Sequence, residues 1–162
     1  MRSRLLALTA LAAALVGCDT SGPDPDVTLT CEDVSLSSDG TLTASTASGA
    51  FRADCFSAQA RTGGVTLIGF EVVLDGGLAT SGEVLGSIEI DVEGTGPGTY
   101  AIGPSSGPRA EAAYSPSGST SLEATSGTVT LTELSADRVR GAFAFETANG
   151  TSVSGGAFDV GL

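Results

Sequence analysis

Three cysteines and nineteen acidic side chains are the residues of this sequence that could take part in covalent or acid–base chemistry. The 162 residues contain no histidine and no lysine, so general acid–base catalysis would depend on carboxylates or tyrosine. Cys18 ends an apolar run near the N-terminus, whereas Cys31 and Cys55 lie in the more polar chain that follows. Cys18 therefore lies at the boundary between the apolar N-terminal run and the rest of the chain, and Cys31 and Cys55 form a pair after that boundary.

Residues 1–17 have the features of a secretory signal. Two arginines precede an apolar core at residues 5–16, which is shorter than the roughly 20 residues of a membrane-spanning helix. The core ends at residues 15–18, Leu-Val-Gly-Cys, which resemble the lipobox of bacterial lipoproteins. This resemblance implies diacylation of the Cys18 sulfur, cleavage before Cys18 and acylation of the new amino terminus, and several acyl chains give stable anchoring. The alternative is an ordinary signal with an incidental cysteine.

Cys31 and Cys55 remain as an even pair in an exported, oxidising compartment, which favours a disulfide. The bridge would close a loop of about 25 residues and stabilise the fold by around 3 kcal/mol. The alternative is a thiol pair with a redox or metal-binding role. The two residues are too far apart for a C-x-x-C motif, and no histidine can complete a zinc site. We predict a structural disulfide between Cys31 and Cys55, no bound metal and no cofactor.

Glu89, Asp91 and Glu93 form a carboxylate row that could bind calcium or supply the two carboxylates of a glycosidase. Side chains on the same face of a strand are about 7 Å apart, too far for one ion unless an adjacent strand contributes ligands. We therefore interpret the row as a solvated sheet face. Residues 103–107 match the G-x-S-x-G pattern of hydrolases, but flanking prolines and the lack of histidine indicate a chance match. We predict no catalytic residues.

Removal of the signal would leave 145 residues, the length of one domain, with a formal charge of −14 after the loss of two arginines. Such a surface is repelled by phosphate backbones, so nucleic acid is excluded as a partner. Residues 18–26 contain two prolines and three aspartates and predict an extended tether, and residues 27–162 form the domain. Asp19, directly after the lipidated residue, is an inner-membrane retention signal in some bacteria, whereas acidic residues near the cysteine direct export to the surface in other lineages. We expect an outer-membrane or cell-surface location, with inner-membrane retention as the alternative.

Strands must position these residues, because apolar residues recur with a period of two from about Val27 onward. In residues 83–94 the apolar positions share one face, opposite the carboxylate row: Val84, Ile88, Ile90 and Val92. Residues 64–74 are apolar on both faces, as in a central strand. About nine strands separated by Gly/Ser/Thr/Pro turns predict an all-β fold, either an antiparallel β-sandwich or a small β-barrel.

The clearest hairpin signal lies near the C-terminus. Phe143 and Phe145 share a strand face, and the dipeptide at 149–150, Asn-Gly, suits a two-residue type I′ turn. Such a turn sets the cross-strand pairs: Phe145 with Ser154, Phe143 with Gly156, and Phe158 with Gly141. The three rings are predicted to form one buried patch.

Three stretches resemble an uncharacterised family of small bacterial lipoproteins: GTYAIG at 98–103, AEAAYS at 110–115, and residues 126–160. That family shares a G-x-Y-x-I/L-G strand, a G-T-V-T-I-T strand, an S-G-x-F-x-F strand and a closing G-x-F. The matching positions are Gly98, Tyr100, Ile102, Gly103, Gly127, Val129, Gly141, Phe143, Phe145, Gly156 and Phe158. The resemblance covers roughly residues 50–162 and implies a β-domain in the envelope, with no catalytic residues.

We therefore expect a membrane-anchored envelope lipoprotein with a non-catalytic β-domain. Its partners would be the membrane, through the lipid anchor, and another envelope protein. Two alternatives remain open. The small inward residues Ala110, Ala112 and Gly141 could leave room for a small apolar ligand in a barrel mouth, or carboxylates could form a hydrolase site.

Overall fold

The computed structural model describes residues 30–32, 35–73, 83–104, 107–116 and 120–162. These residues form ten strands and no α-helix, so the prediction of an all-β fold is confirmed. The strands are β1 (Gly40–Thr46), β2 (Gly49–Arg52), β3 (Cys55–Arg61), β4 (Gly64–Val73), β5 (Glu83–Glu93), β6 (Gly98–Ile102), β7 (Arg109–Pro116), β8 (Leu122–Leu134), β9 (Arg138–Thr147) and β10 (Ser152–Gly161).

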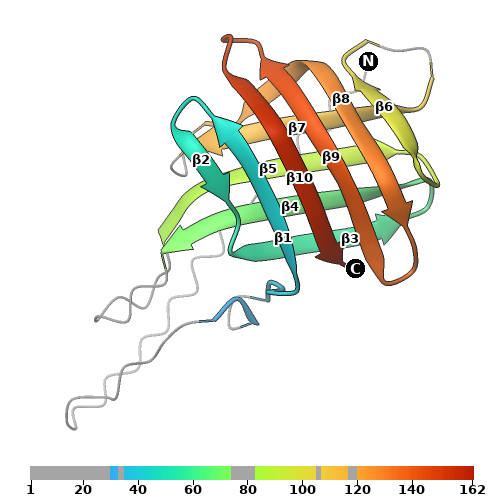
Figure 1. Cartoon of the computed structure of the whole chain (residues 1–162), viewed down its shortest axis with the longest axis horizontal. Coiled ribbons are helices and arrows are strands. Elements are labelled where there is room, and N and C mark those ends of the chain that lie inside the picture. The colour runs from blue at the N-terminus through green and yellow to red at the C-terminus, as the bar shows by residue number, and fades with distance from the viewer. Residues whose placement is uncertain (1–29, 33–34, 74–82, 105–106, 117–119) are drawn as a thin grey trace, which may run out of the picture.

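All ten strands belong to one open, mixed sheet in the order β2-β1-β10-β9-β8-β6-β7-β5-β4-β3. The sheet folds over on itself into two layers, so that β1, β10, β9 and β8 lie in front of β7, β5, β4 and β3 (Figure 1). β8 joins the layers, because its first residues pair with β7 and the remainder pair with β6 and β9. The end strands β2 and β3 are not neighbours, so this sandwich-like sheet is not a closed barrel.

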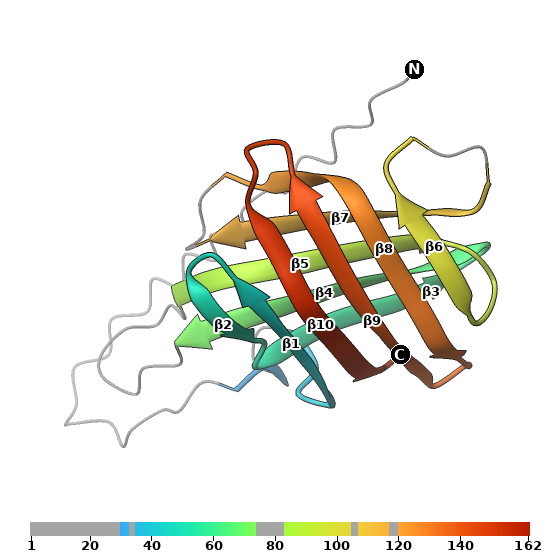
Figure 2. The same ribbon diagram turned by 45° about the horizontal axis from the view of Figure 1, so that its top comes forward.

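One pair of strands, β6 and β7, is parallel, and the prediction of a wholly antiparallel sheet is wrong at this point. The pairs are Ala101 with Arg109 and Ile102 with Ala110, so β7 begins beside the end of β6 and continues in the same direction. Figure 2 shows β7 beginning beside the tip of β6.

The two-residue periodicity places one face of each strand in the core between the layers. On β5, Ile88, Ile90 and Val92 are fully buried, as predicted. Val84, predicted for the same face, is 38% exposed. A β-bulge is the cause, because Glu71 pairs with Gly86 whereas Val72 pairs with Val84, and the register shifts between them. β4 pairs with strands on both sides, which confirms its prediction as an interior strand.

The β9–β10 hairpin buries Phe143, Phe145 and Phe158, as predicted. The ring of Phe143 lies 6.1 Å from that of Phe145 and 6.2 Å from that of Phe158, measured between centroids. The pairs Phe143–Gly156 and Phe158–Gly141 are confirmed. The pair Phe145–Ser154 is wrong, because a bulge before Gly156 makes Phe145 pair with Val153.

The turn of this hairpin also differs from the type I′ prediction. β9 ends at Thr147 and β10 begins at Ser152, so four residues connect the strands. Gly150 has φ of 83°, whereas Asn149 does not adopt a positive φ. The Asn149 side-chain oxygen accepts hydrogen bonds from the Thr151 N–H at 3.0 Å and the Thr147 hydroxyl at 2.6 Å. These bonds hold Asn149 in a longer turn, since its side chain substitutes for a backbone partner.

Candidate functional site

The carboxylate row lies on the outer face of the rear layer, where β5 has β4 on one side and β7 on the other. The cross-strand register sets Asp91 opposite Glu111 of β7. Arg61, at the end of β3, forms an ion pair with Asp91. Arg109 reaches Glu93 at 3.0 Å and Glu111 at 3.4 Å. The two arginines thus neutralise one end of an acidic face.

Glu89 lies in the acidic part of this face. Partial desolvation raises its pKa, and the nearby charges of Glu123, Asp91 and Glu111 raise it further. The side chain of Glu89 still reaches solvent, so the electrostatic penalty of its ionisation is small. The raised pKa marks Glu89 as the carboxylate of this face that is least stabilised by its surroundings.

We predict that Glu89→Gln stabilises the domain at pH 7 by about 0.5 kcal/mol or less. Folding raises the pKa of Glu89, so the ionised carboxylate destabilises the fold above that pKa. The gain should therefore disappear as the pH falls to about 3, well below the ordinary glutamate pKa, where the carboxyl is protonated in the folded and unfolded chains alike. Urea unfolding at both pH values measures it. Glu93→Gln is the control, since it removes the ion pair with Arg109 and should give no gain. A gain of equal size at pH 3 would contradict the electrostatic cause.

The row is bound to its neighbours rather than arranged around an ion. Asp91 also accepts a hydrogen bond of 3.0 Å from the Thr66 hydroxyl. Among the described residues, no group of three or more His, Cys, Asp or Glu side chains is placed to hold a metal ion. Glu89 and Glu93 are exposed, as expected for a solvated sheet face. The sequence did not reveal Arg61 and Arg109 as its partners, because these contacts depend on the register of four strands.

Two clefts open on the described surface. The first, of about 230 Å³, lies where β8 leaves β7 to pair with β6. It is lined by Ile102, Gly103, Pro104, Arg109, Ala110, Glu111, Ala112, Glu123 and Ala124. The second, of about 460 Å³, lies between the β1–β2 and β9–β10 turns and is lined by Ser45, Thr46, Ala47, Asn149, Gly150, Thr151, Ser152 and Ser154. The first lining carries the charged side chains of Arg109, Glu111 and Glu123, whereas the second consists of small residues and Asn149 and has no charged side chain. Residues 105–106 of the G-x-S-x-G pattern lie outside the described residues.

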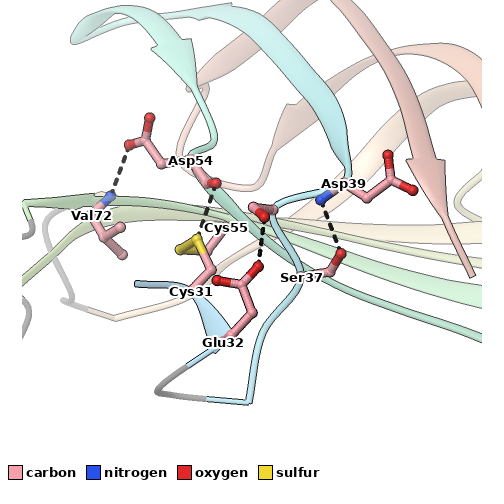
Figure 3. The surroundings of a disulfide bond; sticks show 8 residues. Cys31, Glu32, Ser37, Asp39, Asp54, Cys55 and Val72 are labelled. Atoms are coloured by element: carbon pink, nitrogen blue, oxygen red, sulfur yellow. Dashed lines mark hydrogen bonds between the residues drawn. A yellow bond between two sulfur atoms is a disulfide. The ribbon is translucent and has the colours of Figure 1, made fainter. Parts of the chain in front are cut away.

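A disulfide joins Cys31 to Cys55, which confirms the predicted pairing (Figure 3). Both cysteines are buried, and their Cα atoms are 5.4 Å apart. Ser37, a few residues after Cys31, exchanges two backbone hydrogen bonds of 2.8 Å with Phe56. The bridge and these bonds fix the segment before β1 against the first residues of β3. Cys18 lies outside the described residues.

Comparison with known families places this β-domain in a sequence family. The family described as a domain of unknown function (DUF6252) matches residues 38–161, which include all ten strands. The chain belongs to the DUF6252 family. The match confirms the prediction of an uncharacterised family, and the DUF6252 domain begins ahead of residues 50–162, on which the resemblance was based. Comparisons with curated proteins and with solved structures give no match.

Proposed function

We propose that this chain is a lipid-anchored protein of the bacterial cell envelope whose DUF6252 domain has a non-catalytic, structural or protein-interaction role. The observation that carries the proposal is the Leu-Val-Gly-Cys motif at residues 15–18, placed at the end of an arginine-led apolar segment. Lipidation of Cys18 would leave twelve residues before Cys31, which span at most about 40 Å. The anchor would hold the domain close to the outer membrane or cell surface.

In the part of the chain that the structure describes, no helix is both long enough and apolar enough to cross a bilayer. Membrane attachment of the DUF6252 domain is therefore proposed through the acylated Cys18 and not through a described element. Two or more acyl chains on one residue supply the affinity that a single chain lacks.

The interior of the DUF6252 domain supports a structural role over the binding of an apolar ligand between the layers. A Cβ atom on Gly141 would lie 2.5 Å from the ring of Phe158, and one on Gly156 would lie 2.5 Å from the ring of Phe143. These glycines make room for aromatic rings rather than for a ligand. Ala110 is buried in the same core, and Arg109 beside it carries a charge into the cleft at the β6–β8 junction.

We predict that Cys18→Ser abolishes incorporation of labelled palmitate and leaves a product that is either soluble or still carries its uncleaved signal. The hydroxyl of serine cannot replace the thiol that accepts the diacylglyceryl group. Metabolic labelling of host cells, followed by fractionation and protease shaving, measures anchoring and exposure together. The double variant Cys31→Ser/Cys55→Ser is the control, since it should keep the label. Unchanged labelling of Cys18→Ser would contradict the anchor.

A further inference from the structure

Half of the outer edge of β3 carries backbone groups that no described strand pairs. β3 is the last strand of the sheet and pairs with β4 on one side (Figure 2). On its other side, Phe56 exchanges hydrogen bonds with Ser37. The N–H and C=O groups of alternate residues point the same way along a strand, so those of Ala58 and Ala60 also point outward. A second extended strand can form hydrogen bonds with the outward N–H and C=O groups of such an edge.

β3 lacks the features that usually protect a free edge. Residues Cys55–Arg61 contain no proline, no glycine and no carboxylate, and their register with β4 has no bulge. The opposite end of the sheet, β2, is only four residues long. In a chain with a formal charge of −12, the carboxylate-free edge of β3 lets two copies approach without placing like charges opposite each other.

We propose that a second copy of this chain pairs with β3 in an antiparallel, two-fold contact centred on Gln59. In this register Ala58 of each copy lies opposite Ala60 of the other. The outward N–H and C=O groups of both residues are then hydrogen-bonded on each strand. A register shifted by two residues in one direction would place Ala60 of one copy opposite Phe56 of the other, whose backbone groups are already bonded to Ser37. A shift by two in the other direction would pass the end of β3 at Arg61.

Charge favours a second copy over an unrelated peptide. In the two-fold register, Arg61 of each copy lies opposite Ser57 of the other, at the point where the free edge ends. The segment that closes the edge there, beside Ser37, carries the exposed carboxylates of Glu32 and Asp39. The contact thus brings Arg61 of one copy, which also pairs with Asp91 of its own chain, toward anions of the other copy at both ends of the pair.

The contact is small and therefore weak. One short strand on each side buries much less than the roughly 1,200–2,000 Å² of total area typical of stable interfaces. Association should appear at high protein concentration. It should also increase when the molecules are held on one membrane, because this raises their effective concentration. The inference does not depend on the lipid anchor, since the contact involves only β3. The anchor is tested separately by palmitate labelling of Cys18→Ser.

Cysteine coupling tests the register. Gln59→Cys places a thiol directly opposite the same thiol of the second copy, whereas Ser57→Cys, on the same face and also exposed, lies opposite Arg61. Full-length protein purified from its host is oxidised mildly at high concentration and separated without reductant, and peptide mapping confirms the native Cys31–Cys55 bridge. We expect Gln59→Cys to form covalent dimers several times faster than Ser57→Cys.

The substitution Ala58→Pro, added to Gln59→Cys, tests the backbone pairing. Proline removes an N–H that points away from β4, so the bonds to β4 remain and thermal unfolding can verify the fold. Dimer coupling should be lost. Equal coupling of the two cysteine variants, coupling that survives Ala58→Pro, or capture of a different protein by the Gln59→Cys variant would each overturn the proposal.

Discussion

Replacement of Phe143 by alanine should lower the free energy of unfolding by about 3–5 kcal/mol. The ring is buried, is stacked between Phe145 and Phe158, and covers the backbone of Gly156. Its removal leaves a cavity in the core and uncovers Gly156, to which the Phe143 ring is the nearest neighbour. Since a domain of this size has a total stability of about 5–15 kcal/mol, the effect should be a large drop in the denaturation midpoint, measured by chemical unfolding.

Arg140→Ala is the matched control, because Arg140 lies on the same strand but on the opposite face. It pairs with Asp159 at 2.7 Å and Glu133 at 3.3 Å, and both contacts are partly solvated. We expect a change of about 1 kcal/mol or less. If Phe143→Ala unfolded like the wild type but lost a co-purifying small molecule, the rings would line a binding pocket. The apolar-ligand alternative would then replace the structural role.

Loss of the Cys31–Cys55 disulfide should produce the other large effect. The bridge closes a loop with a sequence separation of 24, and the chain-entropy relation for that length gives about 3 kcal/mol. The double variant Cys31→Ser/Cys55→Ser should therefore unfold at a much lower denaturant concentration. Without the disulfide, the segment that contains Ser37 is held to β3 only by noncovalent contacts such as the hydrogen bonds between Ser37 and Phe56.

Reductant provides the control for this experiment. It should lower the stability of the wild-type domain to that of the double serine variant and leave the variant itself unchanged. A variant as stable as the oxidised wild type would show that packing around Cys55, and not the covalent bond, holds this corner of the fold.

The strand pattern was predictable because alternation is a local property of the sequence. The burial of Ile88 and Ile90 and the outward position of Glu89 follow from a period of two alone. The exposure of Val84 did not follow from it, because a bulge exists only relative to the partner strand. The same reason accounts for the wrong partner of Phe145.

The candidate site was predictable in position but not in its contacts. The carboxylate row was correctly placed on one sheet face, since that needs only the strand itself. Its pairing with Arg61 joins residues thirty positions apart, and such contacts depend on sheet order. The prediction of the turn at Asn149 was wrong for a different reason. The Thr147 hydroxyl and the Thr151 N–H donate hydrogen bonds to the Asn149 side chain and stabilise a backbone conformation other than the one that the dipeptide alone would favour.

The place of β10 in the sheet has a consequence for how the chain acquires its structure as it is made. β10 is synthesised after the other nine described strands, yet it lies between β1, which precedes them, and β9. Until it emerges, β1 has only the short β2 beside it, and the front layer lacks Val153, Phe158 and Val160, which are buried. A nascent chain therefore cannot complete its core by stages. The two layers can close over a complete core only once β10 is available to pair with both β1 and β9.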